Sequence, residues 1–157
     1  MSPVITQAEN LLQFPRETSH MQLDPSAFVA DPELLQALES HATPIACGGE
    51  HVLFRQGDPA SGVYILITGE ATLSMSAESG QSLMSIHATA GSLLGLPGLI
   101  GDQPYSLTAV SDTGAQVSFI ARSEFNALMQ SDPQLALKIL RVLAAEVRSA
   151  RLALTQP

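Results

Sequence analysis

The sequence has no tryptophan, a single cysteine (Cys47) and few aromatic side chains. One thiol cannot form a disulfide within the chain or an all-cysteine cage for zinc or an iron–sulfur cluster. Because 45% of the residues are hydrophobic and only 4% are aromatic, aliphatic side chains must fill the core. No run of about 18 apolar residues occurs, and residues 1–13 lack a basic start followed by an apolar block. We therefore expect a soluble cytoplasmic protein with neither a membrane span nor a secretory signal.

Positive charge is scarce as well. The chain holds 7 Lys and Arg against 15 Asp and Glu, which gives a formal net charge of -8. Between Asp24 and Leu137 only Arg55 and Arg122 are basic. Because nucleic-acid binding draws much of its affinity from Lys and Arg at phosphates, we expect no direct nucleic-acid binding. The remaining cations near the end of the chain are expected on the solvated face of one helix, and they are Lys138, Arg141, Arg148 and Arg151.

A chain of 157 residues is long enough for one ordinary domain. Residues 1–23 show no sustained periodicity, so we predict a mobile N-terminal arm ahead of a domain at 24–157. The first helix is predicted at 32–41, with Asp31 as its cap and Pro32 at its first position.

From Ile45 onward, short apolar or alternating stretches are separated by turn residues, which is typical of antiparallel strands. The predicted strands are 52–55, 63–67, 71–76, 83–87, 107–111 and 116–120, with a hairpin turn at 78–81. This spacing favours a mainly β fold with helices (α+β), an antiparallel β-roll or jelly roll over about 45–121. An N-terminal helix and a C-terminal helical pair at about 123–154 are expected to flank it.

Two helices are predicted at the end of the chain. Ser123 is the expected cap of the first, and Asp132 followed by Pro133 opens the second, which runs to about Leu154. Leu140, Leu143, Val147, Ala150 and Leu154 follow the spacing of a heptad seam, while Leu137, Ile139, Val142 and Ala144 cover another flank. Because one stripe is enough to dock a helix on its own domain, we predict a homodimer through the heptad seam. The alternative is a helix wholly buried in its own fold.

A segment with two turn glycines carries the clearest likeness to a known family. Gly57-Asp58 precedes the strand Val63-Tyr64-Ile65-Leu66-Ile67, and Gly69 follows it. Both glycines are expected at corners with positive φ. The segment 52–71 resembles the opening half of the cyclic-nucleotide-binding domain of catabolite-activator and fumarate-nitrate-reductase regulators. The blocks 90–95 and 103–110 resemble the two ends of that family's phosphate-binding cassette.

The resemblance implies a sensor domain, but two cassette positions depart from it. Leu96 and Tyr105 stand where binders of cyclic nucleotides carry the ribose-binding Glu and the phosphate-binding Arg. A charge-assisted hydrogen bond contributes about 1.5–3 kcal/mol, so the loss of both groups is expected to cost about a hundredfold in affinity. Pro97 also removes a backbone donor from the cassette. We expect weak or absent cAMP and cGMP binding and no cofactor.

The degenerate cassette leaves an apolar candidate site. Its predicted lining is Leu94, Gly95, Leu96, Pro97, Tyr105, Ser106 and Leu107, joined by Leu99 and Ile100. Either these side chains collapse into the cavity, or they receive an apolar or weakly polar ligand whose identity the sequence does not give. The first hypothesis is a dimeric, ligand-responsive regulatory domain; the second is a structural interaction module that contacts a protein partner. Regulators of this kind usually continue into a DNA-binding module, and because this chain ends at Pro157 we expect a stand-alone domain.

Metal-dependent or nucleophilic catalysis is not indicated. The histidines, His20, His41, His51 and His87, show no spacing of metal ligands. Cys47 near His51 is more often a small buried thiol than a nucleophile with its base. No nucleophile elbow, phosphate loop or dinucleotide fingerprint occurs. We predict no metal site, no catalytic residue and no enzymatic activity, and a cupin-like metalloenzyme remains a third hypothesis.

Overall fold

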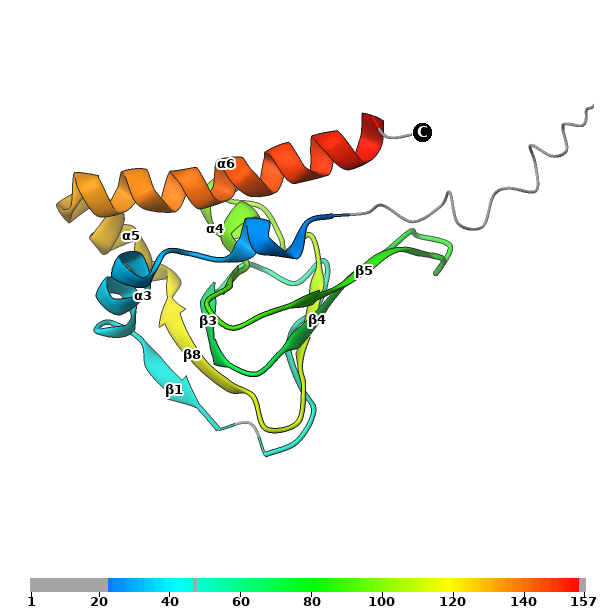
Figure 1. Cartoon of the computed structure of the whole chain (residues 1–157), viewed down its shortest axis with the longest axis horizontal. Helices are drawn as coiled ribbons and strands as arrows, with labels where there is room; N and C mark the ends of the chain where they lie inside the picture. The colour runs from blue at the N-terminus through cyan, green and yellow to red at the C-terminus, as the bar shows by residue number, and fades with distance from the viewer. Residues whose placement is uncertain (1–22, 47, 156–157) are drawn as a thin grey trace, which may run out of the picture.

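The computed structural model describes residues 23–46 and 48–155, so the predicted arm at 1–23 and Cys47 lie outside the described residues except for Leu23. Figure 1 shows a β-roll with one long helix, α6, lying across it, and with α3 and α5 beneath one end of that helix. Among the described residues, no helix is long and apolar enough to cross a membrane.

Two capped helical segments open the described chain. The short 3-10 helix η1 spans Pro25–Phe28, and the Asp24 side chain accepts a hydrogen bond from the Ser26 N–H at 3.0 Å. Helix α3 spans Pro32–Glu39 and begins where the sequence predicts, because Asp31 Oδ1 accepts from the Leu34 N–H at 2.8 Å. Its last residue lies two positions before the predicted end.

The strands form two four-stranded antiparallel sheets, which confirms the predicted roll. The first sheet has the order β1 (Thr43–Ile45), β8 (Gln116–Ala121), β3 (Gly62–Thr68) and β6 (Leu93–Leu94). The second has the order β2 (His51–Phe54), β7 (Thr108–Ser111), β4 (Ala71–Ser76) and β5 (Ser82–Ala88). β4 coincides with its predicted range. In β4 the buried Ala71 and Leu73 alternate with half-buried Thr72 and Ser74, so the apolar face packs into the core.

The predicted turn glycines adopt positive φ, 94° at Gly57 and 86° at Gly69. At Gly69 a Cβ atom would lie 2.8 Å from the Ala115 Cα, so this corner needs glycine both for its conformation and for close backbone packing.

Four short elements lie outside the predicted ranges: η1, β1, β6 and α4 (Leu96–Gly101). β1 contains Pro44, which has no N–H to donate, and an edge strand tolerates it because one side of that strand has no neighbour to accept a hydrogen bond. α4 has six residues and follows Gly95 at φ 99°, and such a length is too short to show a helical period.

The start of α5 (Arg122–Ser131) corrects one sequence prediction. Ser123 is not the cap, because the helix begins directly after Ala121 without a capping side chain. Arg122 fixes this start, since its N–H donates to the Ser61 carbonyl at 2.8 Å and its guanidinium donates to the Ala60 carbonyl at 2.9 Å. The same guanidinium pairs with Asp102.

Helix α6 (Pro133–Thr155) begins as predicted, with Asp132 Oδ1 accepting from the Leu135 N–H at 3.1 Å. Its buried side chains face the domain and are Leu135, Ile139, Val142 and Glu146. Two polar contacts add to this packing: Lys138 pairs with Glu33 of α3, and Ser149 Oγ accepts from the Asp24 N–H at 2.9 Å. The long helix is therefore fixed to both N-terminal helical segments.

Candidate ligand pocket

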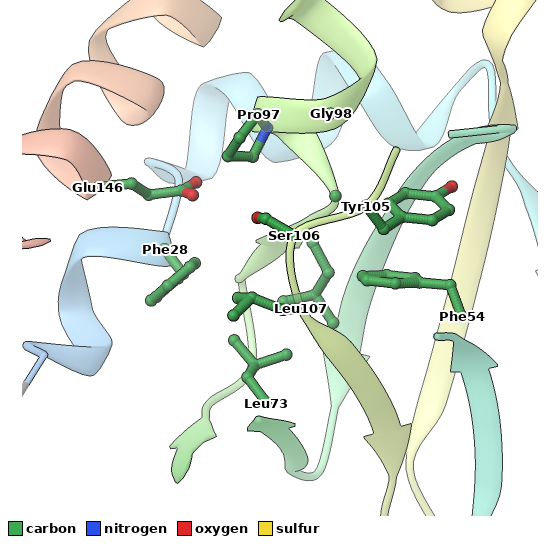
Figure 2. A pocket seen from close by; sticks show the side chains of 11 residues that line it. Phe28, Phe54, Leu73, Pro97, Gly98, Tyr105, Ser106, Leu107 and Glu146 are labelled. Atoms are coloured by element: carbon green, nitrogen blue, oxygen red, sulfur yellow. The ribbon is translucent and has the colours of Figure 1, made fainter. Parts of the chain in front are cut away.

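A small cavity lies between the β-roll and the long helix, at the position of the predicted cassette (Figure 2). It has a volume of about 20 Å³. A single water needs roughly 10–15 Å³, whereas pockets for drug-sized ligands have about 300–1,000 Å³. In this conformation the site has room for one small group. The lining residues are Phe28, Phe54, Leu73, Leu94, Gly95, Pro97, Gly98, Tyr105, Ser106, Leu107 and Glu146.

Most of the predicted site residues meet at this cavity. The predicted residues that line it are Leu94, Gly95, Pro97, Tyr105, Ser106 and Leu107. Leu96 does not line it: the side chain is fully buried in the core, because α4 turns it inward to pack under the helix. Leu99 is likewise a core residue, and Ile100 packs against the core outside the lining.

Tyr105 is held by its surroundings on every side. Its ring stacks on Phe54 with centroids 4.0 Å apart, and only 3% of the residue is exposed. The hydroxyl accepts from the Ser61 and Gly62 N–H groups, each at 3.1 Å, and donates to the Gly62 carbonyl at 2.6 Å. The Tyr105 hydroxyl is thus fully hydrogen-bonded to the backbone at Ser61 and Gly62, and it is not free to bind a ligand.

Close backbone packing narrows the cassette. A Cβ atom on Gly95 would lie 2.8 Å from the Tyr105 ring, and one on Gly98 would lie 2.9 Å from the carbonyls of Gln103 and Pro104. These contacts leave no room for larger residues without movement of the loop. The glycines therefore help to close the cavity around Tyr105.

The opposite wall carries Glu146 of α6. Only 8% of this residue is exposed, and its Oε2 atom has no hydrogen-bond partner among the described residues. Burial raises the pKa of the carboxyl from 4.5 to about 8. In Figure 2 the carboxyl points between Phe28 and Pro97, toward the space that the Ser106 hydroxyl also faces.

Sequence reasoning missed Glu146 because it concentrated on the heptad seam and on apolar residues. A usable signal was present: Glu146 follows Leu135, Ile139 and Val142 at spacings of 4, 3 and 4, which is the phase of the docking face. Phe28, Phe54 and Leu73 also line the cavity and were not predicted, because segments distant from the cassette bring them there. Gly98 of α4 lines it as well and was not predicted.

The described lining of the cavity has an acidic group but no basic one. Among the described residues that line the cavity, Glu146 carries the one carboxyl group, which its raised pKa keeps largely protonated near pH 7, and none is basic. Arg122 contacts Asp102 and the Ala60 carbonyl instead. The arrangement suits a hydrogen-bond donor or a cation better than a phosphate.

The predicted dimer residues lie along the other side of α6. Leu140, Val147 and Leu154 are 43%, 49% and 71% exposed, whereas Leu143 and Ala150 are half-buried. Leu140, Leu143 and Val147 border a shallow groove together with Arg148 and Arg151. An apolar stripe of this kind is available for packing against another helix, and the dimer itself stays a prediction.

One cluster with metal-ligand chemistry occurs away from the lining. Glu70, His87 and Asp112 place ligand atoms within 4.8 Å of one another, and His87 Nδ1 lies 3.5 Å from Thr72 Oγ1. Among the described residues, these three form the one group whose side chains are close enough to hold a metal ion together. Sequence spacing did not reveal them, because sheet register brings together the ends of three strands. Glu70 and His87 are exposed, and exposed groups of this kind are common without an ion.

Comparison with known proteins agrees with this geometry. The family model described as "Cyclic nucleotide-binding domain" matches residues 48–132. The catabolite activator protein of Thermus thermophilus superposes with a TM-score of 0.69 at 24% identity, covering 83% of this chain and 62% of that one. The sensor domain of the transcriptional regulator DNR from Pseudomonas aeruginosa gives a TM-score of 0.58 at 24% identity, with 73% and 77% covered.

A curated relative supports the same assignment from sequence. The CRP-like cAMP-activated global transcriptional regulator of Mycobacterium tuberculosis is 22% identical over 118 residues, which are 75% of this chain and 53% of the relative. The chain thus spans about half the length of that relative. The matched family model covers more than half of the chain, and the two antiparallel sheets and the helix order agree with it. This chain belongs to the cyclic nucleotide-binding domain family, with the fold of the sensor domains of CRP-like regulators.

Proposed function

We propose that this domain is a non-catalytic regulatory sensor whose signal is not cAMP or cGMP. The observation that carries the proposal is the state of Tyr105: it stands at the cassette position of the phosphate-binding arginine, buried and with its hydroxyl fully used. A cyclic phosphate placed there would displace the phenol and gain no cation in return.

The charge of the cavity supports the same reading. A phosphate would enter a lining with Glu146 and no basic residue among the described residues. Desolvating an anion without a paired donor or cation is strongly unfavourable. The family resemblance alone favours a cyclic nucleotide, whereas the chemistry of the lining supports a different ligand.

The output of such a sensor would pass through α6. This helix covers the cavity with Glu146 on one face and exposes Leu140 and Val147 on the other. A ligand that enters must change the packing between the cavity and the helix, and the exposed stripe would transmit that change to a second copy or to another protein. The cAMP activation named for the Mycobacterium tuberculosis relative is a property of that protein.

A second candidate function is a protein-interaction module without a ligand. The small cavity volume of about 20 Å³ favours it, because the conformation needs no ligand to fill its core. In that case α6 would act as a fixed docking helix, and no small molecule would alter its position.

Calorimetric titration of the full chain with cAMP, cGMP and cyclic di-GMP tests the proposal. We expect no saturable heat below about 100 μM for any of them, in line with the lost guanidinium contact. Saturation by cAMP at submicromolar concentration would overturn the proposal. A thermal-shift screen with haem and fatty acids separates the two candidate functions, since a dose-dependent rise of the midpoint supports a sensor and silence across the whole set supports the interaction module.

A further inference from the structure

The wall formed by α6 holds a carboxyl group that the fold does not use. Glu146 is 8% exposed, yet its Oε2 atom has no hydrogen-bond partner among the described residues. Buried ionisable groups in proteins are normally paired or hydrogen-bonded, because desolvation otherwise disfavours them. On this face an apolar side chain would pack as well as Leu135, Ile139 and Val142 do. The carboxyl therefore calls for a role beyond packing.

The direction of the side chain connects this group to the cassette. Glu146 points into the cavity between Phe28 and Pro97, and the Ser106 hydroxyl faces the same space (Figure 2). The remaining surroundings are mostly apolar, with Phe28 of η1 on one side and Leu73 and Leu107 of the roll on the other. A group that enters here meets one acidic oxygen, one hydroxyl and an apolar floor.

We propose that this pocket binds a small organic cation, an amine or amidine with an apolar body, whose N–H groups donate to Glu146. The proposal rests on the proposed function, because it requires that the cassette does not hold a cyclic nucleotide. A charged nitrogen pairs with the carboxylate, completes the hydrogen bonding of Oε2 and lays its apolar part on Phe28 and Leu107. At pH 8 and above, where the carboxyl loses its proton, an anion of the same shape meets repulsion at the same atom.

The present cavity volume sets how such a ligand enters. About 20 Å³ accommodates the nitrogen group, whereas the apolar body needs the wall formed by η1 and α6 to move outward. The Ser149 contact to the Asp24 N–H, at 2.9 Å, links these two elements, so they are expected to shift together. Binding at Glu146 thus displaces the helix that carries the exposed apolar stripe.

Matched probes of equal shape and different charge test the proposal on the full chain. Benzamidine and methylguanidine are the cations, benzamide and methylurea are their neutral counterparts, and benzoate is the anion. The protein variants are wild type, Glu146→Gln, and Glu78→Gln as a control in the exposed β4–β5 turn. The readouts are the dissociation constant from NMR titration and the thermal midpoint, measured at pH 8.

We expect at least one cation to bind wild type and Glu78→Gln at least about tenfold more tightly than its neutral counterpart, with resonances of Ser106, Leu107 and α6 shifting. Glu146→Gln should reduce that preference to less than about twofold, and benzoate should not bind. Equal binding of benzoate, an unchanged preference in Glu146→Gln, or no cation binding at all would overturn the cation proposal. None of these results would restore cyclic-nucleotide binding, so the proposed function is judged separately by the cAMP titration.

Discussion

The two ends of the pocket differ in how their polar groups are used. At the cassette end, Tyr105 donates and accepts through one hydroxyl, and the partners are Ser61, just before β3, and Gly62, its first residue. At the α6 end, Glu146 Oε2 has no partner among the described residues. A paired buried group stabilises the fold, whereas an unpaired one costs stability. The hydrogen bonds of Tyr105 therefore stabilise the fold, whereas Glu146 keeps an oxygen without a partner, as the proposed cation pocket requires.

Removing the Tyr105 side chain should have the largest effect. Tyr105→Ala deletes the stacking on Phe54 and three hydrogen bonds, and it leaves two N–H groups unpaired. We expect a loss of about 3–5 kcal/mol in the free energy of unfolding, measured by urea denaturation. Phe119→Ala, at a half-buried ring, is the control and should lose less. A loss below about 1 kcal/mol for Tyr105→Ala would contradict the structural role.

The free energy of unfolding should depend on pH because of Glu146, at the α6 end of the pocket. The Glu146 pKa is raised from 4.5 to about 8 in the folded state, so the folded protein binds more protons than the unfolded chain between these values. The contribution of this carboxyl to the free energy of unfolding is greatest below pH 4.5 and is lost as the pH rises to about 8. Relative to wild type, Glu146→Gln should therefore gain about 3–4 kcal/mol in the free energy of unfolding between pH 5 and pH 8.

A matched comparison isolates this effect from other groups. Glu78→Gln removes an exposed carboxyl and should follow the wild-type pH profile. If the difference in unfolding free energy between wild type and Glu146→Gln stays constant from pH 5 to pH 8, Glu146 has an ordinary pKa and the contrast between the two ends fails.

The hydroxyl of Tyr105 can be tested without removing the ring. Tyr105→Phe keeps the stacking on Phe54 but leaves the Ser61 and Gly62 N–H groups without their acceptor. We expect a loss of about 1–3 kcal/mol. Tyr64→Phe, at a half-buried tyrosine of β3, should lose less. Equal losses of unfolding free energy in the two variants would show that the Tyr105 hydroxyl stabilises the fold no more than that of Tyr64.

The outer face of α6 gives a prediction about the oligomeric state of the protein, not about its stability. Val147→Glu places a charge in the exposed apolar stripe, and Gln134→Glu places one at the exposed start of the same helix. Light scattering should give a dimer of the 16.5 kDa chain for wild type and Gln134→Glu, and a monomer for Val147→Glu. A wild-type monomer at all concentrations, or a Val147→Glu dimer, would refute the predicted dimer helix.

Local sequence signals predicted much of the fold. Alternation of apolar and hydroxyl residues gave the bounds of β4, and Asp31 and Asp132 marked the first turns of α3 and α6. These signals depend on neighbours along the chain, which the sequence displays directly. β1 was missed because Pro44 is unfavourable in a strand unless the strand lies at an edge.

The pocket was only half predictable. The resemblance to the family located the cassette, including Tyr105 at the arginine position. Leu96 was misplaced because a single turn of helix decides whether a side chain faces the cavity or the core. Glu146 comes from a helix distant in sequence, and its approach to Phe28 and Pro97 depends on how α6 crosses the roll. Such a contact follows from tertiary packing, which local patterns do not specify.

The most direct test is an NMR titration of the Glu146 side-chain carboxyl carbon in the full chain. Because the group is buried and unpaired, its chemical shift should change with a midpoint near pH 8, and benzamidine should lower that midpoint by stabilising the charged form. A midpoint near pH 4.5 that benzamidine leaves unchanged would show a solvated carboxyl, and the account of a pocket built around an unpaired acid would then be wrong.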